Sequence, residues 1–97
     1  MPADVDPGFY DRADAHINLS NDQMAEVVTR GKASASMLYG TARFNAWITA
    51  CEFETGEQMK QSKEETIKYF AAQYEKMLIE NLDDYIENFE KFMKPSH

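Results

Sequence analysis

The chain has 97 residues, of which 43% are hydrophobic and 12% aromatic, a composition that excludes an intrinsically disordered protein and predicts one globular domain. Its 17 acidic and 10 basic residues leave a formal net charge of -7, so neither nucleic acid nor a membrane surface is expected as a partner, because both require a basic face. With a single cysteine and no apolar signal segment near the N-terminus, the protein is expected to be cytoplasmic.

The first expected helix spans residues 7–30 and follows a flexible leader of residues 1–6. From Phe9 onwards, apolar side chains recur at steps of three and four residues, which is typical of one amphipathic helix. Asp6 is a favourable N-cap for this helix, and Gly31 is a natural stop after its last turn.

The second expected helix spans residues 34–54 and contains the most apolar tract of the chain, MLYGTARFNAWITAC over residues 37–51. Arg43 is the only charge in this tract, and apolar side chains surround nearly the whole helix. Such a helix must be enclosed by protein or by lipid, and a membrane span requires about 20 mainly apolar residues. We therefore expect an enclosed helix at the centre of a bundle, ended by Thr55 and Gly56.

The third expected helix spans residues 63–93 and begins at a capping box, in which Ser62 and Glu65 each bond a free backbone N–H. Its expected length is about 46 Å, against about 31 Å for the second helix. Either the helix breaks at Asn81 and folds back, or it stays straight and buries its end against a second subunit. The apolar residues keep their helical spacing without interruption through Asn81, which favours a straight or gently kinked helix. The overhanging apolar side chains are Tyr85, Ile86, Phe89 and Phe92.

Together these elements predict an all-α fold, an antiparallel helical bundle of three long helices that forms a single domain over residues 7–94. The overhang also predicts a homodimer, because a contiguous aromatic patch is rarely left in water.

Arg43 is the most unusual residue of the expected core, because a buried guanidinium must be paired. In one interpretation it binds the carboxylate or phosphate of a small ligand, in a pocket with Asn45 and with Tyr39 or Trp47 as walls. In the other it is a structural clamp to an internal acid, which the excess of acids over bases favours. The acids considered for the clamp are Asp14, Glu26 and Asp84.

The other chemistry-bearing residues form no recognisable site. Cys51 lies among apolar residues without a base beside it, which is typical of an inert packed thiol. His16 has no second histidine or cysteine at metal-ligand spacing. We therefore expect no catalytic residue, no metal ion and no cofactor.

An acidic run without any base lies near the C-terminal end of the third expected helix. It consists of Glu80, Asp83, Asp84, Glu87 and Glu90. Such a run is usually a solvated helix face, and it is also suited to docking a basic protein, binding divalent cations loosely or imitating a nucleic-acid backbone.

Two segments, SASMLYGTARFNAW over residues 34–47 and ENLDDYIENF over residues 80–89, resemble a family of small, all-helical bacterial proteins of unknown function. The similarity extends from about residue 9 to residue 93. It implies a bacterial, and more narrowly a proteobacterial, cytoplasmic protein, and it supplies no activity, cofactor or catalytic residue.

We therefore predict a non-enzymatic acidic helical module that self-associates and binds other proteins. Tyr85, Phe89 and Phe92 are the expected anchors, and the acidic face orients a basic partner. The alternative is a small protein or enzyme that binds an anionic ligand in a pocket around Arg43.

Overall fold

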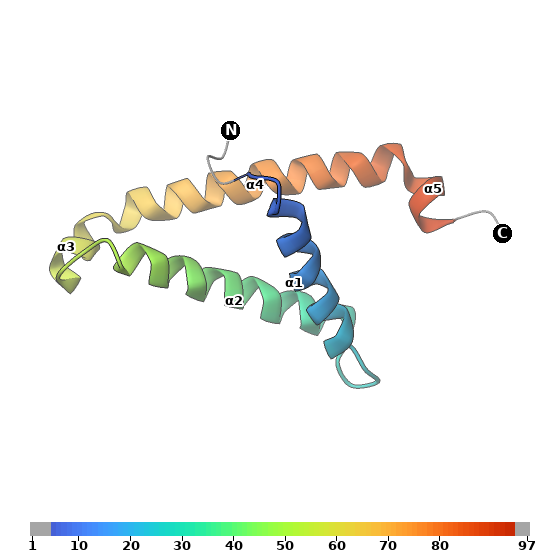
Figure 1. Cartoon of the computed structure of the whole chain (residues 1–97), viewed down its shortest axis with the longest axis horizontal. Helices are drawn as coiled ribbons and strands as arrows, with labels where there is room; N and C mark the ends of the chain where they lie inside the picture. The colour runs from blue at the N-terminus through green and yellow to red at the C-terminus, as the bar shows by residue number, and fades with distance from the viewer. Residues whose placement is uncertain (1–4, 95–97) are drawn as a thin grey trace. The chain divides into compact units, whose positions relative to one another are not determined.

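The computed structural model describes residues 5–94, and every regular element in that range is a helix. In chain order the helices are α1 (Phe9–Gln23), α2 (Arg30–Ala50), α3 (Gly56–Gln61), α4 (Lys63–Glu87) and α5 (Phe89–Met93) (Figure 1). They fall into two compact units, Met1–Glu54 and Thr55–His97. The expected all-α class is confirmed, whereas the expected three long helices are wrong for the described residues, because two of them are interrupted.

Two expectations are left open by this description. Of the flexible leader expected over residues 1–6, residues 1–4 lie outside the described residues. The antiparallel bundle and the single domain over residues 7–94 stay predictions.

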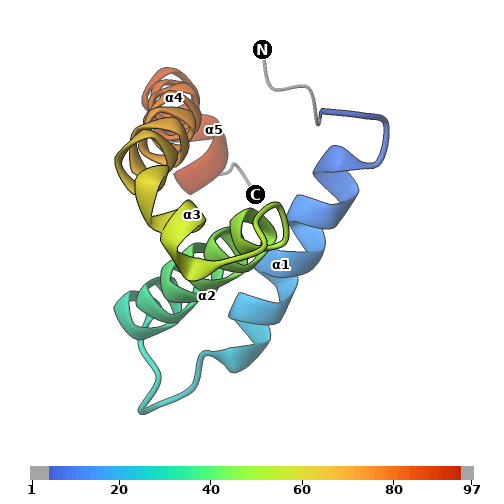
Figure 2. The same ribbon diagram turned by 90° about the vertical axis from the view of Figure 1, so that its left-hand side faces the viewer.

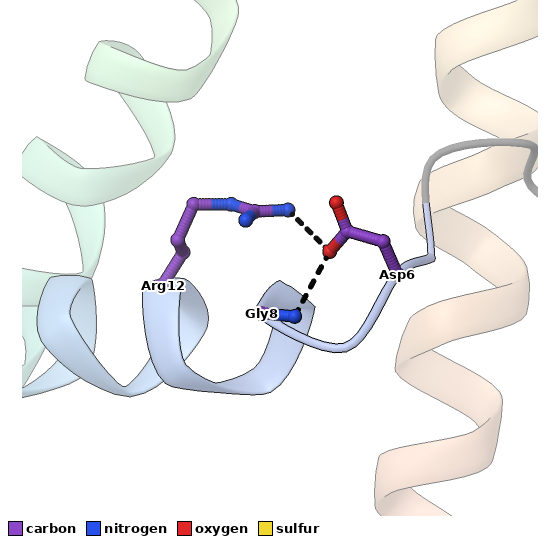
Figure 3. Close-up of polar contacts among 3 residues, drawn as sticks. All are labelled: Asp6, Gly8 and Arg12. Atoms are coloured by element: carbon purple, nitrogen blue, oxygen red, sulfur yellow. Dashed lines mark hydrogen bonds and ion pairs between the residues drawn. The ribbon is translucent and has the colours of Figure 1, made fainter.

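The first unit begins with a polar turn that precedes α1. The Asp6 carboxylate accepts hydrogen bonds from the backbone N–H of Gly8 (3.1 Å) and from Nη2 of Arg12 (2.9 Å), as Figure 3 shows. The hydrogen bond from Arg12 lowers the pKa of the Asp6 carboxyl below its ordinary value of 3.8. Asp6 therefore satisfies a backbone donor ahead of the helix, as expected of a cap, although the first helical residue is Phe9.

Helix α1 ends at Gln23, so the helix expected over residues 7–30 is too long at its C-terminal end. Met24 has an extended backbone, and Ala25 and Val28 exchange backbone hydrogen bonds of 3.0 and 3.1 Å in the loop that Figure 2 shows between α1 and α2. The last turn of α1 is rich in Ser, Asn and Asp, whose short polar side chains favour helix ends over helix interiors. Apolar residues before and after the loop keep the same helical spacing, so the sequence pattern did not reveal this boundary.

Helix α2 begins at Arg30, ahead of the expected start at residue 34, because Thr29 caps it. The Thr29 backbone is extended, and its Oγ1 accepts a hydrogen bond from the N–H of Lys32 at 3.3 Å. Gly31 therefore lies in the first turn of α2 and does not end the preceding helix.

The core of the first unit is confined to the region where α1 and α2 pack next to their connecting loop. Ala33 is 5% exposed and is the one buried residue among residues 5–94. Farther along, α2 extends beyond α1 (Figure 1), and Tyr39 (71%) and Trp47 (59%) are exposed. Within the first unit α1, with 15 residues, therefore does not enclose the 21-residue α2, and enclosure of this tract by the rest of the expected bundle stays a prediction.

The second unit begins with a short helix that the sequence pattern did not predict. Thr55 caps α3, because its Oγ1 accepts a hydrogen bond from the N–H of Gln58 at 3.1 Å. Helix α4 then begins at Lys63 as predicted, but the predicted capping box is wrong. Ser62 has near-helical dihedral angles (φ -97°, ψ 1°) because it also ends α3, and its hydroxyl donates to the carbonyl of Met59 at 2.9 Å.

Helix α4 continues to Glu87, and the chain turns at Asn88 into α5 (Figure 1). The break considered at Asn81 is wrong: this residue stays helical, and its Nδ2 donates to the carbonyl of Met77 at 2.7 Å. Asn88 leaves the helical region (φ -115°, ψ 28°), and its Nδ2 donates to the carbonyl (3.0 Å) and the carboxylate (2.9 Å) of Asp84. The third expected helix is therefore interrupted close to its end.

Candidate functional site

Three of the four residues predicted for an anion site share one exposed face of α2. Tyr39, Arg43 and Trp47 follow one another at intervals of four residues on a continuous helix. Asn45 lies on the opposite side, because two residues turn a helix by about 200°. Asn45 is half-buried, and its carbonyl accepts a hydrogen bond from the Thr49 hydroxyl at 2.8 Å. The structure therefore separates Asn45 from the other three side chains.

Arg43 is exposed, so its charge does not carry the cost of a buried guanidinium. Among the described residues of its own unit it forms no ion pair with Asp14 or Glu26, so the clamp to these acids is wrong. The clamp to Asp84 stays a prediction. Water and salt compete with an exposed guanidinium for any anion, which weakens the electrostatic attraction.

The predicted interface residues occupy the end of α4 and the short helix α5. Tyr85 and Phe92 bring their ring centroids to 5.1 Å. The Lys94 ammonium lies 6.0 Å from the centre of the Phe89 ring, within the range of a cation–π contact. Ile86 is 70% exposed. The turn between the two helices therefore gathers aromatic rings without burying them.

Exposed apolar side chains also continue along the rest of α4, towards its N-terminus. We call the following residues the apolar stripe of α4: Ile67, Phe70, Tyr74, Met77, Leu78 and Tyr85. Phe70 is half-buried, and the other five are exposed. Their helical spacing is typical of a core face, but spacing alone does not show what covers such a face. Within the second unit, α3 has six residues and α5 has five, too few to cover a helix of 25 residues.

The acidic run forms a ridge on α4 beside the apolar stripe. Its members there are Glu80, Asp83, Asp84 and Glu87, all exposed. At their spacing these four side chains lie within about 100° of the helix circumference. Glu90 belongs to α5 and approaches Lys94 Nζ at 3.6 Å. Within residues 5–94, no three side chains of His, Cys, Asp or Glu are grouped so that they hold a metal ion.

Cys51 is exposed at the C-terminal end of α2. His16 is exposed on α1. Cys51 is the C-cap of α2, and its backbone N–H donates to the carbonyl of Trp47 at 3.1 Å. The prediction that this thiol is packed in a core is therefore wrong, because the helix end on which it lies is left uncovered.

Comparison with known proteins assigns the chain to a family. Residues 9–86 match the family described as "Protein of unknown function (DUF3144)", a match that covers most of the 97 residues. The chain belongs to this family. The expected membership of a small, all-helical family of unknown function is thereby confirmed.

A solved structure is similar to this DUF3144 protein over nearly its whole length. It is described as "NMR structure of the protein NB7890A from Shewanella sp" and is 38% identical in sequence, with a TM-score of 0.74. The similarity covers 98% of this chain and 100% of that chain. No curated protein matches the sequence. Within residues 5–94, no helix combines the length and the apolar character that crossing a membrane requires.

Proposed function

We propose that this protein is a non-enzymatic module that self-associates as a homodimer. The observation that carries the proposal is the very small core: among residues 5–94 only Ala33 is buried, although α2 and α4 both bear large exposed apolar side chains. Burial of apolar surface offsets the conformational entropy that is lost on folding, and a small domain buries only slightly more apolar surface than this requires. The helices of each unit therefore need cover that the unit itself does not supply.

We propose that a second copy of this chain supplies that cover, through the exposed aromatic side chains at the end of α4 and on α5.

The residues proposed to anchor this association are Tyr85, Phe89 and Phe92, because aromatic rings contribute much of the binding energy in protein interfaces. The acidic ridge on α4 is proposed to stay in water and to attract a basic protein partner. We also keep the cytoplasm of a bacterium as the proposed location, since an exposed free thiol such as Cys51 suits a reducing compartment.

Light scattering coupled to gel filtration tests the proposal. At micromolar concentration we expect the mass of a dimer, and we expect the combined substitutions Phe89→Ala and Phe92→Ala to lower that mass while the helical circular dichroism signal remains. Tyr10→Ala is the matched control, because it removes an exposed aromatic ring from α1 and is expected to leave the dimer intact. A monomeric mass for the unmodified protein at this concentration would refute self-association.

A second candidate function is the binding of an anionic ligand by Tyr39, Arg43 and Trp47, and the shared face of these residues on α2 favours it. We place it second because the high exposure of both rings offers little protection from water. If it is correct, phosphate or citrate raises the melting temperature of the unmodified protein and not that of Arg43→Ala. The same rise in both proteins would rule out a role for this side chain.

A further inference from the structure

The junction between α4 and α5 interrupts a sequence that otherwise suits one continuous helix. Residues 57–94 contain neither Pro nor Gly, and the apolar residues keep their helical spacing from α4 into α5. Nevertheless, among the described residues the backbone N–H groups of Phe89, Glu90 and Lys91 form no helical hydrogen bond to the carbonyls four residues earlier. The cause of this turn therefore lies in side-chain interactions.

Two residues at the junction hold the turn through their side chains. We infer that Asp84 and Asn88 form a latch that keeps α5 turned away from the axis of α4, and that α4 continues to Met93 when the latch is released (Figure 1). Nδ2 of Asn88 donates to the backbone carbonyl of Asp84 at 3.0 Å and to its carboxylate at 2.9 Å. Asp84 is exposed, so water competes for this carboxylate and keeps the latch weak enough to open.

Asn81 shows that a hydrogen bond from an Asn side chain to a helical carbonyl does not end this helix. Its Nδ2 donates to the carbonyl of Met77 at 2.7 Å, and the residue stays helical. Met77 offers no side-chain oxygen, whereas Asp84 holds the same position relative to Asn88 and offers a carboxylate. Because hydrogen bonds to an ionised group are the stronger ones, the carboxylate is the part of the latch that distinguishes the two sites.

The turned and the continuous arrangements differ little in free energy. Each residue that extends a helix in water contributes little, since the propagation constant is only about 1–1.6 for good helix formers. Continuation of α4 would also bring Glu87 and Lys91 to a favourable four-residue spacing, and this ion pair does not form within residues 5–94 as they stand. A few side-chain contacts are therefore enough to decide between the two arrangements.

The latch determines which aromatic ring lies against Tyr85. In the turned arrangement the ring centroids of Tyr85 and Phe92 are 5.1 Å apart. In a continuous helix seven residues rise by about 10.5 Å, and Phe89, four residues from Tyr85, becomes its neighbour instead. These rings are the proposed anchors of the homodimer, but the latch acts within one chain and does not require a second copy.

Solution NMR of the full chain tests the latch through ring contacts and amide exchange. In the unmodified protein we expect a nuclear Overhauser effect between the rings of Tyr85 and Phe92. In Asp84→Ala we expect its loss, a new effect between Tyr85 and Phe89, and slower exchange of the Phe89 amide proton. Asp83→Ala is the matched control, because it makes the same change in charge and helix propensity one residue away and is expected to keep the original contact.

Asn88→Ala removes the latch from its other side and serves if Asp84→Ala does not fold. Its control is Asn81→Ala, which removes the corresponding hydrogen bond to a carbonyl and is expected to leave the rings of Tyr85 and Phe92 in contact. An unchanged contact in Asp84→Ala or in Asn88→Ala would overturn the inference. Equal loss of the contact in a variant and its control would also overturn it, because helix propensity alone would then explain the change.

Discussion

The N-cap of α2 permits a sharp test of the structure, because two threonines of one chain are expected to respond with opposite sign to the same substitution. Thr29 lies outside the helix and accepts the N–H of Lys32 at 3.3 Å. Removing such a cap costs about 1 kcal/mol. Thr41 lies inside the helix, and its hydroxyl only donates to the Met37 carbonyl, which already belongs to the helical ladder. Alanine has a higher helix propensity than threonine by roughly 0.5 kcal/mol.

Thermal unfolding followed by circular dichroism measures both effects, at one protein concentration because association affects stability. For a domain of this size a change of 1 kcal/mol moves the melting temperature by about 4–8 °C. We therefore expect Thr29→Ala to lower the melting temperature by about 4–8 °C and Thr41→Ala to raise it by about 2–4 °C. Ser34→Ala is the control, because residue 34 was the start expected from sequence and lies inside α2. A loss of stability at Ser34 and none at Thr29 would refute the observed start of the helix.

Three further outcomes are expected. Gly40→Ala should stabilise the protein by up to about 1 kcal/mol, because a Cβ added to this helical residue meets no atom within 4 Å; absence of a gain in thermal unfolding would indicate that another surface packs closely there. Arg43→Ala should change the free energy of unfolding by less than about 0.5 kcal/mol, since the side chain is exposed. A much larger decrease of this free energy in urea denaturation would support the interpretation of Arg43 as a structural clamp. Arg12→Gln should raise the pKa of the Asp6 carboxyl towards 3.8 in an NMR titration, and an unchanged pKa would contradict the contact. Because the pKa of Asp6 is lowered, the contact stabilises the folded chain above the ordinary carboxyl pKa and is lost as the pH falls through the lowered one.

The sequence alone determined the helical class and several helix positions. The start of α4 at Lys63 and the apolar periodicity along it were predicted correctly, because both depend on residues close together in the chain. The family resemblance was likewise a property of the sequence. The cap at Thr29 could have been found as well, since a threonine ahead of a helical segment is a common N-cap.

Helix ends and exposure were decided by the three-dimensional structure. The apolar phase continued across the loop after Gln23 and across Asn88, so periodicity did not reveal either interruption. The exposure of Tyr39, Arg43 and Trp47 depends on which other helices lie against α2, and the pattern of a helix does not contain that information. Local hydrogen bonding therefore determined which residues are helical, and the packing of α1 against α2 determined that Ala33 is the one buried residue among residues 5–94.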